Sequence, residues 1–174
     1  MSKKIIPAAL IILTISFSAG IFTEIAIPSD NVRISTDLPS VYASIFEYIK
    51  SDGLTVISSL IFSVSVFLMP LVPLLILGKT FSLGFSAAYI LSSSAEKAFG
   101  IVITALVPRA LFKIPAYLAI ALTAAETAAF IRNNYQNPSA LAHGIKRHLL
   151  RFISCFLILA ASSVVEACLL QGVL

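Results

Sequence analysis

Residues 5–27 read IIPAALIILTISFSAGIFTEIAI, and this stretch decides the fold class. A membrane-spanning helix needs about 20 consecutive, mainly apolar residues. The stretch is that long, and its only charged residue, Glu24, lies near its end. A cleaved signal peptide is the alternative, because Lys3 and Lys4 give the chain a basic start. The apolar run is longer than that of a typical signal peptide and continues past the small residues 18–20, so we expect an uncleaved first span.

The composition of the whole 174-residue chain is also that of a membrane protein. Hydrophobic residues make up 59% and charged residues 11%, and the mean hydropathy is +1.01. In soluble domains about a quarter of the residues are charged. The net charge of +4 would suit a nucleic-acid binder, but the basic residues lie at the ends of apolar segments. That distribution indicates membrane topology, so we expect no nucleic-acid partner.

Five apolar segments are long enough, or nearly long enough, to cross a membrane. They are residues 5–27, 54–77, 80–95, 101–131 and 152–172. The third is short, so a re-entrant segment is an alternative to a full span. The sequence therefore predicts an all-α fold with a single transmembrane domain over residues 1–174. This domain would be a polytopic membrane helix bundle of about five helices.

The distribution of lysine and arginine predicts the orientation of this bundle, because cytoplasmic loops carry an excess of both. With the N-terminus inside, the outer side holds only Arg33, Lys50 and Lys97. The inner side then holds Lys3, Lys4, Lys79, Arg132, Lys146, Arg147 and Arg151. We therefore expect a multi-pass protein of the cell membrane, with its N-terminus inside and its C-terminus outside.

The outer loop, residues 28–52, contains a stretch with apolar residues at helical spacing. This spacing predicts a short amphipathic helix that lies on the outer surface and is a possible partner-binding segment. Its apolar residues are Val41, Tyr42, Ile45, Tyr48 and Ile49. The pair Asp52–Gly53 then predicts a turn into the second span.

The basic inner loop, residues 132–151, begins with a turn-rich cluster. Asn137 followed by Pro138 is typical of the first residues of a helix. We expect a basic helix that continues into the last span and whose cations contact anionic lipid headgroups. Glu126, near the inner end of the fourth span, is expected to reach the headgroups or to pair with a cation of this loop.

Three polar side chains lie within the fourth span. Arg109, Lys113 and Tyr117 are spaced by four and share one helical face. Charges at membrane depth are costly and usually pair or line a pathway. The last span carries one carboxylate, Glu166, which the predicted topology places at a depth similar to that of Arg109. We therefore expect a Glu166–Arg109 pair, with Lys113 as the alternative partner.

Such a pair has two interpretations, a static lock between helices or a functional polar site. Buried pairs specify an arrangement more reliably than they add stability, which favours the lock. Pro108 and Pro115 leave backbone carbonyls without a helical donor in the same span, so kinks there could bring the cations toward the bundle axis.

Enzyme chemistry has no support in the sequence. His143 and His148 are five positions apart and share no helical face well, and no thiol or carboxylate cluster lies near them. No phosphate-binding glycine loop or zinc-protease motif occurs. Cys155 and Cys168 are too far apart on one helix to form a disulfide with each other. We expect no enzyme activity, no metal and no cofactor.

The order of features from about residue 55 to residue 172 resembles the stage II sporulation protein M family. The first matching piece is FSVSVFLMPLVPLLILGKTFSLGFSAAYILS, residues 62–92. The second is ITALVPRALFKIPAYLAIALTAA, which contains Pro108 and Pro115, and the last is LAASSVVEACL, which contains Glu166. The resemblance implies a five-span membrane protein without enzyme activity. In spore formers that family anchors the stage II sporulation proteins D and P, which degrade peptidoglycan during engulfment.

Two functions therefore stand as hypotheses. The first is a membrane scaffold, either a single chain or a homo-oligomer, that anchors or localises partner proteins at the lipid bilayer. The alternative is a membrane subunit of a transporter or channel, with a polar path lined by Arg109, Lys113 and Glu166.

Overall fold

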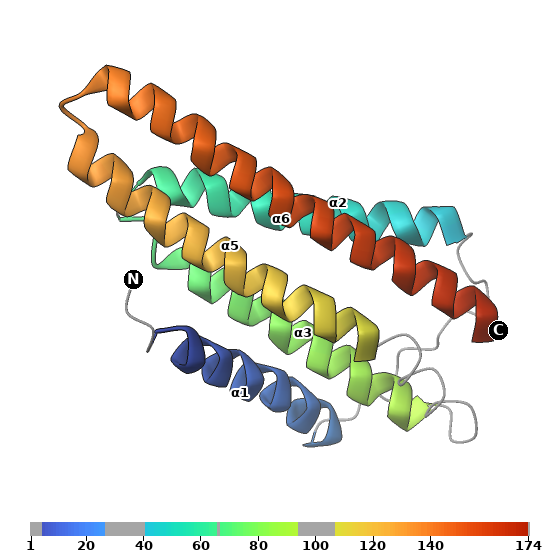
Figure 1. Cartoon of the computed structure of the whole chain (residues 1–174). Helices are drawn as coiled ribbons and strands as arrows, with labels where there is room; N and C mark the ends of the chain where they lie inside the picture. Colours follow the sequence, from blue (N-terminus) through green and yellow to red (C-terminus); the bar gives the residue numbers. More distant parts are fainter. Residues whose placement is uncertain (1–4, 27–40, 66, 94–106, 174) are drawn as a thin grey trace.

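The computed structural model of this chain describes residues 5–26, 41–65, 67–93 and 107–173. These residues form five helices and no strand, as Figure 1 shows. Their bounds are α1 Ile5–Ala26, α2 Val41–Val64, α3 Leu71–Ser93, α5 Val107–Asn134 and α6 Pro138–Val173. The predicted all-α bundle is thereby confirmed.

Successive helices run in opposite directions along the bundle (Figure 1). As a result, α1 begins and α6 ends at opposite ends of the molecule, as the predicted odd number of crossings requires. The central helix is α5, which contacts α1, α2, α3 and α6. Because α5 is surrounded in this way, polar residues on its inner face meet protein atoms and not lipid.

Four of the described helices are long and apolar enough to cross a membrane. These stretches are Ile6–Ala26, Leu71–Tyr89, Ala110–Asn134 and Gly144–Val165. Their outward faces carry large exposed apolar side chains such as Ile15, Phe22 and Leu74, which suits contact with lipid. The chain is a multi-pass membrane protein.

The exception among the described helices is α2, which is 24 residues long and lies along the other helices but contains no apolar stretch of that kind. Its first half contains Glu47, Lys50 and Asp52. Several of its buried positions are hydroxyl residues. Their hydroxyls donate to backbone carbonyls of the same helix, from Thr55 to Ser51 at 3.0 Å and from Ser59 to Thr55 at 2.8 Å. Each of these hydroxyls therefore has a hydrogen-bond acceptor within α2 and needs none from a neighbouring helix.

The predicted second and third spans differ from the observed helices. We expected separate spans over 54–77 and 80–95, with Lys79 between them on the inner side, but α3 runs through this boundary without a break. The break lies earlier, at residues 65–70, where the Leu68 and Met69 amides donate to the Ser65 carbonyl. Pro70 favours this position, because a proline disfavours helical geometry at the residue that precedes it.

The predicted turn at Asp52–Gly53 is also wrong, because α2 continues through it. Gly53 serves close packing instead: a Cβ added there would lie 3.3 Å from the Phe156 ring of α6. Two further glycines bring α1 and α3 together. A Cβ at Gly20 would collide with the backbone carbonyl of Phe81, and one at Gly84 with that of Phe17.

The predicted start of the last helix is confirmed. Asn137 precedes Pro138, the first residue of α6, and its carbonyl accepts the Leu141 amide at 3.0 Å. The helix then continues without a break from the basic segment into the last apolar span, as expected. The predicted first span also agrees with α1 to within one residue.

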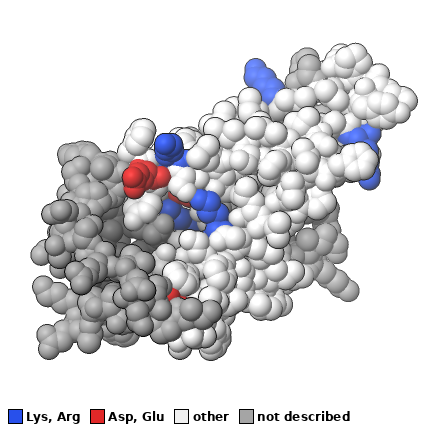
Figure 2. Space-filling view, turned by 180° about the vertical axis from the view of Figure 1, so that it is seen from behind, with Lys and Arg blue, Asp and Glu red and all other residues white. Residues whose placement is uncertain are grey.

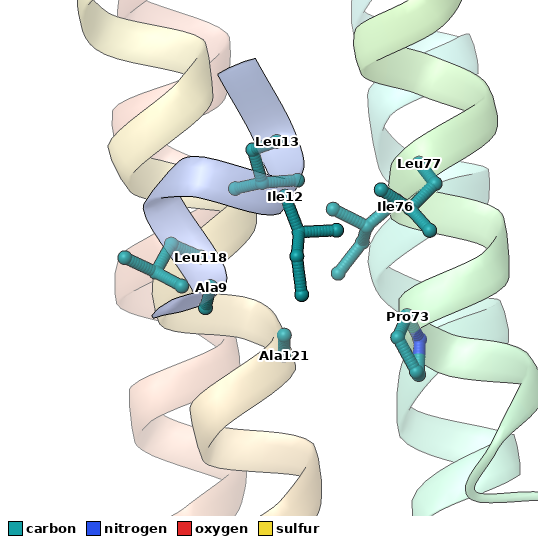
Figure 3. Close-up of a pocket in the computed structure, with 8 residues that line it drawn as sticks. All are labelled: Ala9, Ile12, Leu13, Pro73, Ile76, Leu77, Leu118 and Ala121. Carbon is teal, nitrogen blue, oxygen red and sulfur yellow. The ribbon is translucent and has the colours of Figure 1, made fainter. Parts of the chain in front are cut away.

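An apolar cavity of about 110 Å³ lies between α1, α3 and α5. Figure 3 shows that its lining side chains come from all three helices. They are Ala9, Ile12, Leu13, Pro73, Ile76, Leu77, Leu118 and Ala121. Beside it, the Ser16 hydroxyl of α1 donates to the Leu77 carbonyl of α3 at 2.9 Å. Because the lining carries no polar side chain, this cavity offers no recognition site for a polar solute.

Candidate functional site

A buried ion pair joins α2 to α5. The Lys113 ammonium lies 2.9 Å from Asp52 Oδ2, and the two side chains are only 2% and 4% exposed. The same ammonium lies over the Tyr48 ring of α2, with 5.5 Å between Nζ and the ring centroid. This distance is within the range of a cation–π contact.

Two hydroxyl groups complete the environment of the carboxylate. The Tyr117 hydroxyl, one turn along α5 from Lys113, donates to Asp52 Oδ1 at 2.8 Å. The Ser163 hydroxyl of α6 has one proton for two acceptors, Asp52 Oδ2 at 3.3 Å and the Leu159 carbonyl at 3.2 Å. We call Asp52, Lys113, Tyr117 and Ser163 the polar cluster. It connects α2, α5 and α6.

The polar cluster lies far from the ends of the helices. Asp52 is about 17 Å along α2 from Val41, at about 1.5 Å per residue. A carboxylate at such depth is tolerated when it is paired and hydrogen-bonded, because an unpaired charge in a low dielectric is far more costly. The lysine and the two hydroxyls meet that requirement.

A polar cavity of about 330 Å³ adjoins the polar cluster between α2, α3 and α5. Its lining consists of Tyr48, Ser51, Asp52, Lys79, Ser82, Leu83, Ser86, Lys113 and Tyr117. Figure 2 shows blue and red atoms gathered around a hollowed region of one face, beside the grey residues. The remaining blue atoms on that face lie at the far end of the molecule. Charge is therefore concentrated at the cavity.

Lys79 supplies the second cation of this lining. Its ammonium lies 2.5 Å from the Ser51 hydroxyl oxygen of α2. Among the side chains that the structure describes, no carboxylate lies within 4.0 Å of it. The lining therefore carries two lysines against one aspartate, and the aspartate is paired with Lys113.

The sequence correctly placed Lys113 and Tyr117 on one inward face of α5, since both are buried and both contact Asp52. It did not identify Asp52, which was assigned to a turn, or Lys79, which was assigned to an inner loop. A signal for Asp52 exists: at helical spacing it is followed by Thr55, Ser59 and Ser63, all buried. A stripe of small polar residues that begins at an acid indicates a helix that continues through Gly53.

The expected Glu166–Arg109 pair lies outside the described side chains. The backbones of both residues belong to helices, α6 and α5 respectively, and the pairing stays a prediction. Of the two prolines in α5, Pro108 lies in the first turn, where a proline is tolerated, and Pro115 lies inside the helix.

The expected partner-binding segment is the first part of α2. The side chains of Val41, Tyr42 and Ile45 lie outside the described ones. Tyr48 and Ile49 are half-buried, and Tyr48 lines the polar cavity. The segment therefore belongs to a bundle helix and is not a separate helix on the outer surface.

A second ion pair lies toward the end of the bundle where α5 is joined to α6. Arg151 of α6 pairs with Glu126 of α5, and both side chains are 42% exposed. This confirms the prediction that Glu126 pairs with a cation of the basic segment. Nearby, the His148 ring packs against Phe130 with 5.4 Å between ring centroids.

No protein-family model, curated protein or solved structure matches this chain.

Proposed function

We propose that this protein is the membrane subunit of a transporter or channel in the cell membrane. The polar cavity between α2, α3 and α5 is the place where the solute binds. One observation carries this proposal: a cavity of about 330 Å³ lined by two lysines, an aspartate and three serines lies within the bundle. Ionisable residues at membrane depth mark substrate and ion pathways in many membrane proteins.

The depth of the cavity supports a role in transport. Lys79 is about 12 Å along α3 from Leu71, at about 1.5 Å per residue, and the opposite end of α3 is farther away. In secondary transporters, solute sites lie near the middle of the bilayer at helix interfaces. A cavity at this position between antiparallel helices fits that arrangement.

A polar route toward the cavity follows α2. Glu47 and Lys50 are exposed on the half of α2 that precedes Ser51 and Asp52. Charged side chains exposed to hydrocarbon are costly, so this part of α2 faces water or another protein and not lipid. Water along this face would connect the cavity to the end of the bundle where α2 begins, which the charge distribution assigns to the outer side.

The scaffold hypothesis, with stage II sporulation proteins D and P as partners, has less support from the geometry. It assigned partner binding to an amphipathic helix on the outer surface, whereas Tyr48 of that segment lies in the bundle against Lys113. The scaffold hypothesis predicts that substitutions in residues 41–49 abolish the co-purification of partners while the protein still folds.

Flux into proteoliposomes tests the transport proposal. The purified full chain is reconstituted, and uptake of radiolabelled acetate, phosphate and choline is followed. We expect uptake of at least one solute, and we expect it to fall at least tenfold in Lys79→Gln. Lys146→Gln is the control, because Lys146 is exposed on α6 and does not line the cavity. Uptake equal to that of empty liposomes for all three solutes would contradict the proposal.

A further inference from the structure

We propose that the polar cavity binds a small oxyanion, a carboxylate or a phosphate monoester, with Lys79 as its principal ligand. This inference rests on the proposed function, because it names the solute class of the same cavity.

The charge of the lining is the first argument. Lys113 is neutralised by Asp52 at 2.9 Å, whereas the Lys79 ammonium has only the Ser51 hydroxyl among the described side chains. Among the described lining residues, one positive charge is thus in excess. Since a charge within the membrane requires a partner, a bound anion is what completes the site electrically.

The direction of the Lys79 side chain is the second argument. A lysine near a helix end commonly extends its ammonium to the membrane surface, where it is hydrated. Lys79 instead reaches across to Ser51 on α2, so its ammonium lies at the cavity between the helices. This position is the one from which it can contact a molecule in the cavity.

The hydrogen-bonding groups around Lys79 are the third argument. An ammonium has three donors, and one of them is used by Ser51. The Ser51 hydroxyl accepts that bond and keeps its own proton to donate. Ser82 adds a second hydroxyl to the lining. It lies three residues after Lys79 on α3, and its side chain is exposed. Donors therefore predominate, and a carboxylate or phosphate oxygen accepts from such a set.

A cation is disfavoured by the same groups. Asp52, which is the only carboxylate among the described lining residues, is already bonded to Lys113 and to the Tyr117 hydroxyl. A cation in the cavity would meet two ammonium groups and no available carboxylate. The cavity volume of about 330 Å³ lies at the lower end of the usual range for ligand pockets, so the anion is small.

The oxyanion could belong to a free metabolite or to a lipid headgroup. The depth of Lys79, about 12 Å from the start of α3, favours a free anion, because headgroups lie at the surface of the bilayer. The test therefore includes free anions as one set of probes and a lipid with a phosphate headgroup as another.

The experiment measures binding and not flux. The full chain in detergent is titrated calorimetrically with sodium acetate, sodium benzoate, inorganic phosphate and choline chloride, and the chain in neutral-lipid nanodiscs is titrated with a short-chain phosphatidic acid. We expect saturable binding of an anion and none of choline. We expect Lys79→Gln to weaken anion binding about 10- to 100-fold, since a hydrogen bond to a charged group is lost. Lys146→Gln, which changes an exposed lysine of α6 outside the lining, should bind as the original chain does.

The outcomes separate this inference from the proposed function. Saturable binding of phosphatidic acid alone supports the oxyanion site and assigns it to a headgroup. Choline binding, or no binding of any probe by the original chain, overturns the inference whether or not the variants fold. If flux is seen without anion selectivity, the inferred oxyanion site is contradicted and the transport proposal is supported. If an anion binds at Lys79 and no flux occurs, the transport proposal is contradicted and the proposed oxyanion site is supported.

Discussion

Lys113 of α5 and Asp52 of α2 form a buried ion pair, 2.9 Å from Nζ to Oδ2, that lies in the interior of a membrane helix bundle. The pair joins a helix that is apolar enough to span a membrane to one that is not. The ion pair therefore helps to hold α2 against α5 in the bundle.

Neutralising either member of this pair should destabilise the fold. Asp52→Asn or Lys113→Gln leaves one buried charge without its counter-ion, which costs about 3–5 kcal/mol of the free energy of unfolding. The double variant should recover most of that loss, because no unpaired charge remains. Reversible unfolding in a graded series of denaturing detergent measures all three variants.

The matched control for this prediction is Glu126→Gln, which removes the acid of the Glu126–Arg151 pair. Both side chains of that pair are 42% exposed, so the substitution should change the free energy of unfolding by about 1 kcal/mol or less. If Asp52→Asn costs no more than this control, the ion pair is not a determinant of stability.

Removing the Tyr117 hydroxyl should have a smaller effect. Tyr117→Phe keeps the buried ring but takes away the donor to Asp52 Oδ1, at a cost of about 0.5–1.5 kcal/mol. The coupling between Tyr117→Phe and Asp52→Asn, measured in a double-mutant cycle, isolates this bond. Strictly additive effects would show that the hydroxyl does not act through Asp52.

The close packing of α1 on α3 should depend on two glycines. Gly84→Ala or Gly20→Ala places a methyl group against a backbone carbonyl of the neighbouring helix, so the helices must separate, at about 1–3 kcal/mol or more. Gly78→Ala is the control, because a Cβ there meets no atom within 4 Å. It should be neutral or stabilising by about 0.5–1 kcal/mol. Equal losses of thermal stability at Gly84 and Gly78 would refute the packing role.

Cys168 provides a test of the predicted orientation. It is exposed near the end of α6, whereas Cys155 is buried. In intact cells that express a Cys155→Ser variant, a membrane-impermeant maleimide should label Cys168 from outside. Labelling that requires permeabilised cells would show that the C-terminal end of α6 lies inside.

The sequence predicted those parts of the fold that depend on local pattern. Apolar length defined α1, and the Asn137–Pro138 pair marked the start of α6, because both signals lie in neighbouring residues. The boundaries of α2 and α3 depended on contacts distant in sequence. Asp52–Gly53 has the composition of a turn, but packing of Gly53 on Phe156 and pairing of Asp52 with Lys113 keep that region helical.

The site could be predicted only in part, because it too depends on contacts between residues that are distant in sequence. Helical spacing was enough to place Lys113 and Tyr117 on one face, since both lie on α5. Their partner could be found only by bringing α2 alongside α5. Lys79 was assigned to the inner side because it lies between residues 54–77 and 80–95, which were expected to be separate spans. Its ammonium is instead accommodated in mid-helix by Ser51 on α2.

The position of the ion pair in the chain has a consequence for how the protein is made. The ribosome delivers α2 before α5, so Asp52 reaches the membrane before Lys113 has been synthesised. A helix with Glu47, Lys50 and Asp52 is a poor candidate for insertion alone. Insertion of α2 is therefore expected to wait until α5 has emerged, and chains stopped after α3 should leave α2 accessible to protease. We therefore expect the order of insertion in this protein to differ from the order of synthesis.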